Sequence, residues 1–338
     1  MKVGILTSGG DAPGLNAVIM GIVKSRKEAE IVGFFDGWKG LMEKRFRILE
    51  DNDVDGIHKI GGTILGTSRV NPIKIEGAVE KIKSNLDELG VESLIAIGGD
   101  DTLGVAYQLY ERGINAIGVP KTIDNDVGGT DYTFGFNTAV TTATELIDKL
   151  HTTAKSHRRV MVVEIMGRYS GWITFESGLA GGAHIILIPE AEKTLDEIYD
   201  LIKKTYKKRD YCLIALSEAF KPKELTQRIE DEGKVDSFGH AMLGGIGEWL
   251  AERIKQDTGI ETRSIKLGHT VRGGSPSAFD RVLGLRFGAK AMDLVLQGVA
   301  GEMVALRRNI IVSVPMEEAL KRKDVPLEYY HFGERFFC

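Results

Sequence analysis

The sequence predicts an α/β protein with two Rossmann-like three-layer α/β/α lobes and mostly parallel sheets. Three observations support this fold class. Apolar runs of strand length alternate with helical patterns, which is typical of parallel sheets covered by helices on both faces. The 338 residues are enough to form two lobes. Many of the 41 glycines directly follow strand-like runs, where the chain must turn tightly.

Seven aliphatic runs have the length and composition of buried strands. They are Val3–Leu6, Ile31–Phe35, Leu94–Ile97, Ala116–Val119, Val160–Ile165, Ile185–Ile188 and Cys212–Leu216. Segments between and after them repeat apolar residues at helical spacing. These expected helices are Leu15–Ala29, Ile75–Leu89, Leu103–Arg112, Thr138–Thr153, Leu195–Tyr206 and His240–Gln256. Neither a tandem repeat nor a low-complexity linker is present, so we expect the chain to cross between the lobes more than once. The tail from Val325 is aromatic and is expected to be irregular.

The composition excludes several classes of protein. A hydrophobic content of 43% and a charged content of 27% are typical of a soluble globular protein, and a net charge of -4 gives no footprint for nucleic acid. The N-terminus enters a strand pattern directly, and no apolar run is long enough to span a membrane, so we expect neither a signal peptide nor a membrane partner. Two cysteines, Cys212 and Cys338, are too few for a disulfide framework or a zinc site. We therefore expect a cytoplasmic protein with Cys212 in its core.

Two acidic segments, Gly98–Thr102 and Pro120–Asp126, directly follow strand-like runs. Both should therefore lie at the carboxyl edge of one sheet, where open α/β folds bind ligands. Together they supply four carboxylates and one lysine: Asp100, Asp101, Asp124, Asp126 and Lys121. Such a group suits a magnesium-bridged polyphosphate and a base for a hydroxyl nucleophile. Capping aspartates would explain either segment alone, but the two together favour the chemical interpretation.

Two glycine-rich loops add possible anion contacts. Thr7–Asn16 joins the first strand to the first helix, and its N–H groups could hold a phosphate. It is neither a dinucleotide fingerprint nor a P-loop, and a simple turn explains it about as well. The second loop, Gly61–Arg69, supplies glycines, hydroxyls and one arginine. Arg69 could stabilise a transferring phosphoryl group, although a single loop arginine is more often solvated.

The order of these motifs resembles that of the 6-phosphofructokinases, over nearly the whole chain. The segments that carry the resemblance are Ser8–Asn16, Gly61–Arg69, Gly98–Thr102, Thr122–Asp126, Met166–Arg168 and Gly268–Gly274. The resemblance implies reversible transfer of a phosphoryl group to the 1-hydroxyl of fructose 6-phosphate, in glycolysis and gluconeogenesis. It implies a donor-binding lobe of residues 1–137 plus about 271–321, and a sugar-phosphate-binding lobe of 138–270 plus about 322–338. It also implies a homodimer or homotetramer with shared active sites.

The same resemblance assigns roles to individual residues. Asp124 is the implied general base, and Asp100 is the implied ligand of Mg²⁺. The donor is expected to contact Gly9, Gly10, Arg69, Asp101 and Lys121, and the catalytic set to comprise Asp124, Lys121, Asp101, Thr122 and Arg168. The role of Asp126 stays open between orienting the loop or the metal waters and simply capping a turn.

The sugar-phosphate end is rich in arginine, whose forked donors suit a phosphate dianion. By the resemblance, the sugar phosphate contacts Thr122, Ile123, Asp124, Arg159, Met166, Gly167, Arg168, Glu218, Arg263, His269 and Arg272. Taken singly, each arginine could be a solvated surface residue and His269 an ordinary core histidine. In the family some of these arginines reach in from a neighbouring subunit.

The pair Asp101 and Lys121 resembles the pyrophosphate-dependent branch of the family, whereas nucleotide-using members usually carry glycine at the position of Asp101. A carboxylate about 4 Å from the α-phosphate of ATP would cost about 4 kcal/mol at an effective dielectric near 20. Pyrophosphate has no third phosphate and avoids this repulsion. The counter-interpretation is that Asp101 and Lys121 form a local salt bridge that says nothing about the donor.

Other functions explain less of the sequence. The nearest alternative is an ATP-dependent 6-phosphofructokinase. A lipid or NAD kinase shares a Gly-Gly-Asp loop but not the segments Pro120–Asp126 and Gly268–Gly274. A non-catalytic sugar-phosphate-binding regulatory subunit would be expected to lose Asp100 or Asp124, and an NAD-dependent oxidoreductase would need its fingerprint. Met20 stands where allosteric relatives carry an arginine, so we expect a non-allosteric enzyme.

Overall fold

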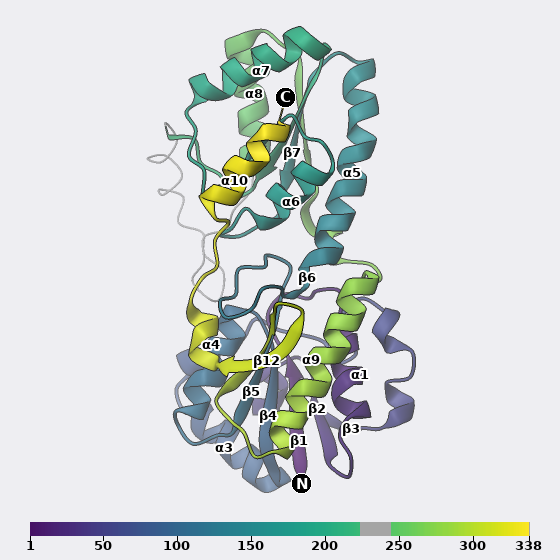
Figure 1. The fold of residues 1–338 in the computed structure, drawn as a ribbon. Helices are drawn as coiled ribbons and strands as arrows, with labels where there is room; N and C mark the ends of the chain where they lie inside the picture. Colours follow the sequence, from purple (N-terminus) through teal and green to yellow (C-terminus); the bar gives the residue numbers. More distant parts are fainter. Residues whose placement is uncertain (224–244, 338) are drawn as a thin grey trace.

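The computed structural model describes residues 1–223 and 245–337, which form two lobes stacked end to end (Figure 1). Each lobe contains its own sheet with helices packed on both faces. The predicted α/β class with mostly parallel sheets is therefore confirmed. The expected start of a helix at His240 and the second cysteine, Cys338, lie outside the described residues.

The larger sheet is mostly parallel. It contains β1 (Lys2–Thr7), β2 (Glu30–Phe34), β3 (Phe46–Leu49), β4 (Val91–Gly98), β5 (Ala116–Thr122), β6 (Phe134–Gly135), β11 (Glu302–Arg307) and β12 (Ile310–Pro315). Its order is β12-β11-β5-β4-β1-β2-β3, with β6 paired to β5. Among the described strands of this sheet, only the edge pairs β2–β3 and β11–β12 are antiparallel. Because β1 lies between β4 and β2, the sheet reverses its winding there, and the loops after β1 and β4 meet at this switch point.

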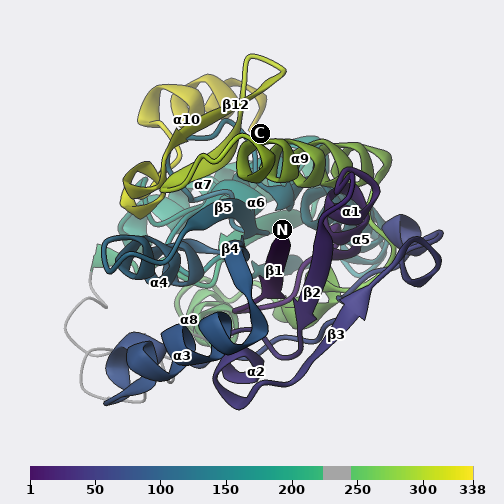
Figure 2. The ribbon, with the colours of Figure 1, turned by 90° about the horizontal axis from the view of Figure 1, so that it is seen from below.

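Helices cover both faces of the larger sheet (Figure 2). They are α1 (Leu15–Lys24), α2 (Trp38–Glu43), α3 (Ala78–Leu89), α4 (Asp100–Tyr110) and α9 (Ala278–Leu296). On one face α1 and α9 pack against each other and against the sheet, with Val18 and Phe287 fully buried. On the other face α3 and α4 contribute Ile82 and Leu103 to a separate core. The carboxyl edge of the sheet is thus left free to face the second lobe.

The smaller sheet is entirely parallel, with the order β10-β7-β9-β8. Its strands are β7 (Val160–Ile165), β8 (Ile185–Leu187), β9 (Cys212–Ser217) and β10 (Thr262–Lys266). Its helices are α5 (Phe136–Ser156), α6 (Trp172–Ala180), α7 (Leu195–Arg209), α8 (Ile246–Thr258) and α10 (Leu327–Gly333). Short 3₁₀ helices connect the elements: η1 (Asp51–Asp53), η2 (Ile57–Lys59), η3 (Pro72–Lys74), η6 (Gly268–Arg272), η7 (Met316–Leu320) and η8 (Glu334–Phe336). Cys212 is buried in β9, within the core of the smaller lobe, as the sequence predicts.

The structure corrects two expected elements. The first helix does not reach Ala29 but ends at Lys24, because Lys27 has a φ of 50° and Arg26 turns to pair with Asp51. The tail from Val325 is not irregular, since α10 packs Tyr330 into the core of the smaller lobe. The helix α9 and the strands β3, β10, β11 and β12 were not predicted.

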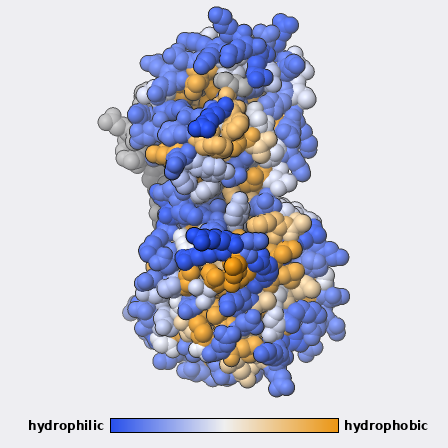
Figure 3. Space-filling view, viewed as in Figure 1, coloured by the Kyte–Doolittle hydropathy of each residue, from blue (hydrophilic) through white to orange (hydrophobic). Residues whose placement is uncertain are grey.

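The face seen in Figure 3 is mainly hydrophilic, with scattered hydrophobic groups over both lobes. Among the described residues, the exposed large apolar side chains include Phe279 and Val282 on α9 and Ile310 on β12. Across residues 1–223 and 245–337, no helix combines the length and apolar character that crossing a bilayer requires.

We expect one buried group to contribute a loss of about 3 kcal/mol of unfolding free energy as the pH falls from about 6.5 to about 4. The cause is His184, which is 3% exposed and whose Nδ1 accepts a hydrogen bond from the Leu213 N–H at 2.9 Å. Burial, with help from His151 and Arg209, lowers the pKa of His184 to about 4. The folded state thus keeps the ring neutral while the unfolded chain takes up a proton.

Urea unfolding of the wild type and of His184→Asn across this pH range measures the effect. The asparagine oxygen retains an acceptor but does not titrate, so the variant should lose less stability in acid. His157→Asn is the matched control, because His157 is exposed. Parallel pH profiles for wild type and His184→Asn would contradict the assignment.

Candidate active site

The loop after β1 is fixed by backbone contacts at the switch point. The Ser8 N–H donates to the Ile97 carbonyl at 3.0 Å, which extends the pairing of β1 with β4. Gly9 then turns with a φ of 83°, a conformation that favours glycine. Its N–H donates to the Ser68 carbonyl at 3.0 Å, so the loop after β1 and the Gly61–Arg69 loop are joined directly.

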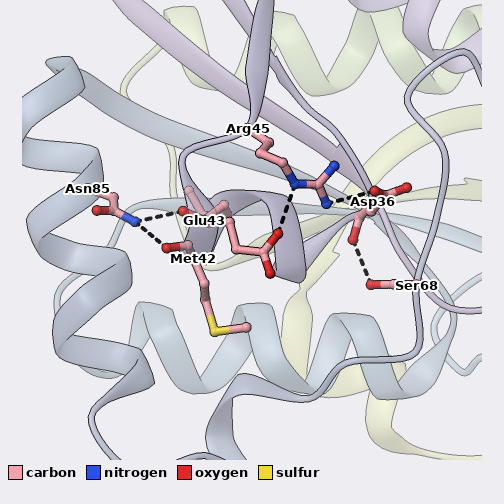
Figure 4. A network of polar contacts seen from close by, with 7 residues as sticks. Asp36, Met42, Glu43, Arg45, Ser68 and Asn85 are labelled. Atoms are coloured by element: carbon pink, nitrogen blue, oxygen red, sulfur yellow. Dashed lines mark hydrogen bonds and ion pairs between the residues drawn. The ribbon is translucent and has the colours of Figure 1, made fainter.

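Side chains reinforce this junction. Thr67 Oγ1 donates to the Gly9 carbonyl at 2.7 Å, and Asn16 holds Ile64 N–H at 2.8 Å through its side-chain oxygen. Ser68 Oγ donates to the Asp36 carbonyl at 2.6 Å, and the Asp36 carboxylate pairs with Arg45 (Figure 4). These hydrogen bonds fix the Gly61–Arg69 loop along one side of the site. Arg69, at the end of this loop, lines the pocket.

The carboxylates Asp100 and Asp101 occupy the first turn of α4, immediately after β4. Their position requires Gly98, because a Cβ there would lie 2.3 Å from the Cβ of Thr102. Both carboxylates line a pocket at the carboxyl edge of the sheet. They sit at a helix N-terminus, where the helix dipole stabilises negative charge.

The end of β5 contributes Lys121, Thr122 and Asp124 to the same pocket. Lys121 is 3% exposed, and its ammonium donates to the Gly10 carbonyl. Thr122 Oγ1 accepts a hydrogen bond from the Asp124 N–H at 3.0 Å, which fixes the turn. Asp124 is 7% exposed, and its buried Oδ1 has no hydrogen-bond partner among the described residues. That oxygen is available to accept a proton from a bound hydroxyl.

Two carboxyl groups of the loop after β5, those of Asp124 and Asp126, have raised pKa values. Burial raises the pKa of Asp124, and Asp100 adds to the rise, while Arg272 and Arg168 oppose it. Burial also raises the pKa of Asp126 to about 8, with Asp124 and Asp100 contributing like charge. These carboxylates crowd one another, and a bound cation would relieve their repulsion.

Lys121 is perturbed in the opposite direction. Burial and the nearby Arg272 lower the pKa of its ammonium to about 8, against the attraction of Asp124, Asp11 and Asp100. A cation with a lowered pKa in an enclosed site suits a ligand that carries several negative charges.

Arg168 and Tyr169 of the second lobe close the pocket, together with Arg272 at the junction of the two lobes. Arg272 bridges the two lobes, since its Nη1 donates to the Asp11 carbonyl at 3.1 Å and its Nε lies 3.1 Å from the Met166 sulfur. Beside it, Glu218 accepts a hydrogen bond from the Gly167 N–H at 3.2 Å. Burial raises the pKa of Glu218, and the Gly167 N–H opposes the rise.

The structure thus brings most of the predicted residues together. The pocket is lined by the predicted Gly9, Gly10, Arg69, Asp100, Asp101, Lys121, Thr122, Asp124, Arg168 and Arg272. Met166, Gly167 and Glu218 adjoin it through the contacts above. The Ile123 side chain is fully buried in a hydrophobic core, so only its backbone can face a ligand. His269 is exposed on η6 and is absent from the pocket lining.

Two predicted arginines lie far from this pocket. Arg159 precedes the six-residue strand β7, whereas Met166 follows it, so about 20 Å of strand separates them. Arg263 pairs in register with Met161 near the same amino end, and its guanidinium lies 2.9 Å from Glu261. Neither can reach the pocket of its own chain in this conformation.

The pocket also contains residues that sequence reasoning left unassigned. Gly99 and Thr102 flank the two carboxylates on α4, and Tyr169 follows Arg168. The sequence signal that could have identified these three residues is that each is next to a predicted site residue. Asp126, whose role the sequence left open, lines the pocket as well.

The acidic residues offer oxygen ligands but not a complete metal cage. Within the described part of the chain, no three His, Cys, Asp or Glu side chains are grouped to hold a metal ion by themselves. The carboxylates do fit a cation that takes most of its ligands from a bound polyphosphate and from water, as Mg²⁺ does.

Comparison with known proteins agrees with the geometry. Residues 2–295 match the family model described as phosphofructokinase. The chain is 52% identical to a protein of Amycolatopsis mediterranei (strain S699) named pyrophosphate--fructose 6-phosphate 1-phosphotransferase, over 100% of both chains. It is 45% identical to a protein of Corynebacterium efficiens named ATP-dependent 6-phosphofructokinase, over 100% of this chain and 99% of that one.

A solved structure shows the same fold. Pichia pastoris phosphofructokinase in the T-state superimposes with a TM-score of 0.81 and 31% sequence identity. The alignment covers 94% of this chain but 35% of that one, so the chain spans about a third of the length of the Pichia protein.

Proposed function

Because the chain belongs to the phosphofructokinase family, we propose that it transfers a phosphoryl group from pyrophosphate to the 1-hydroxyl of fructose 6-phosphate. The products are fructose 1,6-bisphosphate and inorganic phosphate. The observation that carries the donor assignment is the presence of Asp101 and Lys121 in the pocket that also holds Asp124, whose Oδ1 has no hydrogen-bond partner in residues 1–223 and 245–337. Relatives whose names specify pyrophosphate support the same donor.

The site residues divide into those that bind the phosphoryl donor and those that bind the sugar phosphate. Gly9, Gly10, Arg69, Asp101 and Lys121 surround the donor, within a donor-binding lobe of residues 1–137 plus about 271–321. The remaining residues, 138–270 plus about 322–338, form the sugar-phosphate-binding lobe. The oxygen of the sugar 1-hydroxyl attacks phosphorus while Asp124 accepts the proton of that hydroxyl. The P–O bond to the departing phosphate breaks in the same step. Lys121, Arg168 and Arg272 stabilise the negative charge that develops on the transferring group.

Asp100 would hold Mg²⁺ at the start of α4, where the ion supplies charge neutralisation to the phosphate oxygens. Thr122 orients Asp124 through the hydrogen bond at 3.0 Å between its hydroxyl and the Asp124 N–H. Met166, Gly167 and Glu218 face the sugar ring from the smaller lobe.

The active protein is proposed to be a homodimer or homotetramer with shared active sites. Arg159 and Arg263 lie at the amino end of the smaller sheet, and for Arg159 the length of β7, about 20 Å, separates it from its own pocket. From there they bind the 6-phosphate in the site of a neighbouring subunit. The compartment is proposed to be the cytoplasm, because two cysteines are too few for the disulfide framework typical of small secreted proteins.

A coupled assay with purified protein tests the donor. With fructose 6-phosphate and equal Mg²⁺, turnover with pyrophosphate should exceed that with ATP by at least about tenfold. The reverse reaction from fructose 1,6-bisphosphate and phosphate should also proceed. Faster turnover with ATP would assign the chain to the nucleotide-dependent branch. Binding of the sugar phosphate without turnover of either donor would instead indicate a regulatory subunit.

We expect kcat/KM for pyrophosphate to fall as the pH rises above about 8. The pKa of Lys121 is lowered to about 8, so its ammonium is charged below that pH and neutral above it. Because kcat/KM reports the free enzyme, the alkaline limb belongs to the unliganded lysine. In Lys121→Arg the guanidinium stays charged and the limb should move to higher pH. An identical limb in this variant would assign the titration to another group.

Rate curves are expected to stay hyperbolic in fructose 6-phosphate, with or without ADP and phosphoenolpyruvate. Met20 packs against the core of the larger lobe and offers no charge to a nucleotide effector. Initial rates over a range of sugar phosphate measure this. A sigmoidal curve that ADP makes hyperbolic would contradict the expectation.

A further inference from the structure

The segment Leu267–Ser277 carries Arg272 to the pocket, and the stretch after Arg272 lies at the surface, where the Gly274 backbone packs against Gly61. It joins β10 to α9 and contains η6. Residues 273–275 are exposed, and the faces of Gly273 and Gly274 where a Cβ would stand meet open space. A guanidinium placed by such a segment needs anchors elsewhere, because a small displacement of a charged group costs much of its catalytic effect.

The first end of the segment is held by Glu164, a buried residue of β7 that is 2% exposed. Its Oε1 lies 3.0 Å from the Lys266 ammonium, at the end of β10. Its backbone carbonyl accepts a hydrogen bond from the Leu267 N–H at 2.9 Å. Its Oε2 accepts one from the Gly247 N–H in the first turn of α8, at 2.8 Å. Glu164 therefore joins the start of the segment to a helix N-terminus.

Glycine at position 247 makes this approach possible. A Cβ there would lie 3.0 Å from both the Cβ and the Oε2 of Glu164, closer than side chains ordinarily approach. The N-terminus of α8 therefore meets the carboxylate through its backbone, where the helix dipole favours negative charge.

The second end is held by Asp280, which is completely buried in the first turn of α9. Its Oδ2 accepts hydrogen bonds from the Thr138 N–H at 2.7 Å and from the Thr138 hydroxyl at 2.5 Å. The same hydroxyl accepts a bond from the Ser277 N–H at 2.9 Å, and Ser277 Oγ donates to Asn137 at 2.8 Å. The N-termini of α5 and α9 thus cap each other across one buried carboxylate.

Both anchors are costly to build. A buried carboxylate loses its hydration and is retained only where charges or N–H groups replace the lost water. Glu164 and Asp280 each lie outside the pocket lining, and both carboxylates are held by the contacts given above. What they share is their place at opposite ends of the segment that bears Arg272.

We propose that Glu164 and Asp280 are positioning residues that hold the segment Leu267–Ser277 at its two ends and thereby place Arg272 between the lobes. The expected effect of these residues on turnover rests on the proposed function, whereas their effect on the position of Arg272 does not. The placement itself is a property of the unliganded chain, in which Arg272 contacts the Asp11 carbonyl and the Met166 sulfur.

The test uses Glu164→Gln and Asp280→Asn, which keep an acceptor oxygen for the helix N–H groups and remove the charge. Hydrogen–deuterium exchange of the unliganded full-length protein should show roughly tenfold faster exchange of the amides in 267–277 in both variants. Lys266→Met is a second route to the first anchor, because Lys266 is half exposed and its loss should be tolerated by the fold. Asp257→Asn is the control. It changes α8 at its other end, where Asp257 accepts from the Tyr199 hydroxyl at 2.7 Å, and should leave this exchange unchanged.

A double-mutant cycle with Arg272→Ala separates positioning from a general loss of structure. In the wild-type background, Glu164→Gln should lower kcat/KM for fructose 6-phosphate roughly tenfold. In the Arg272→Ala background, the same substitution should change kcat/KM less than about twofold. Equal losses in both backgrounds, or unchanged exchange of 267–277 in every variant, would overturn the proposal. If the wild type turns over neither donor but exchange rises in the variants, the proposed function fails and the anchoring stands.

Discussion

Replacement of Asp124 by asparagine is expected to lower kcat by about three orders of magnitude, while the KM for pyrophosphate changes little. A positioned general base contributes about 10²–10⁴-fold. Asp124 fits that role because its buried Oδ1 has no hydrogen-bond partner among the described residues and because burial raises its pKa. The amide cannot accept the proton of the sugar hydroxyl. The stability of the variant should be retained, since asparagine removes a charge whose burial is unfavourable.

Steady-state kinetics and thermal unfolding on the same preparation measure both effects. Asp131→Asn is the matched control. It lies on the same loop, but its carboxylate accepts from the Arg308 N–H at 2.7 Å and is outside the pocket lining. A kcat for Asp124→Asn within tenfold of wild type would assign the base to another group.

Replacement of Asp101 by glycine is expected to lower turnover with pyrophosphate and to admit ATP. The repulsion between this carboxylate and an α-phosphate is about 4 kcal/mol at 4 Å, which corresponds to about three orders of magnitude in affinity. Asp101 lines the pocket in the first turn of α4, so a longer donor extending past the reacting phosphates would meet its charge. Adding Lys121→Gly should improve the use of ATP further.

The ratio of kcat/KM for ATP to that for pyrophosphate is the measurement. Asp101→Asn separates charge from size, because the amide occupies the same space as the carboxylate. It should admit ATP nearly as well as glycine does if repulsion is the cause. Glu80→Gly, the same kind of change in the first turn of α3 and outside the pocket lining, should leave the ratio unchanged. An unaltered ratio in both Asp101 variants would show that the donor is selected elsewhere.

Elements with strong local patterns were predictable. The run Val160–Ile165 matches β7 residue for residue, and the expected helix Leu195–Tyr206 matches α7 except for its last turn. The helix α9 was missed because its apolar residues are spread around the helix, which packs beside α1 on the sheet and also exposes Phe279 and Val282. Its single-face periodicity is therefore weak. The edge strand β3 is exposed at three of its four residues. The edge strand β12 begins with the aliphatic residues Ile310–Val312, but only one of its six residues is buried.

The sequence by itself determined which chemistry the chain can perform. The motifs after β4 and β5 supply carboxylates and a lysine at the ends of parallel strands, and such ends meet at one edge of a sheet. Only the tertiary structure decided which distant residues share that site. It brought Arg272 to the Asp11 carbonyl across 261 positions of chain and left Arg159 and Arg263 at the opposite end of the smaller sheet. The spacing of apolar and polar residues determines which helix or strand forms and which of its faces is buried. The distances between elements depend instead on how the lobes, the helix ends and the buried carboxylates pack.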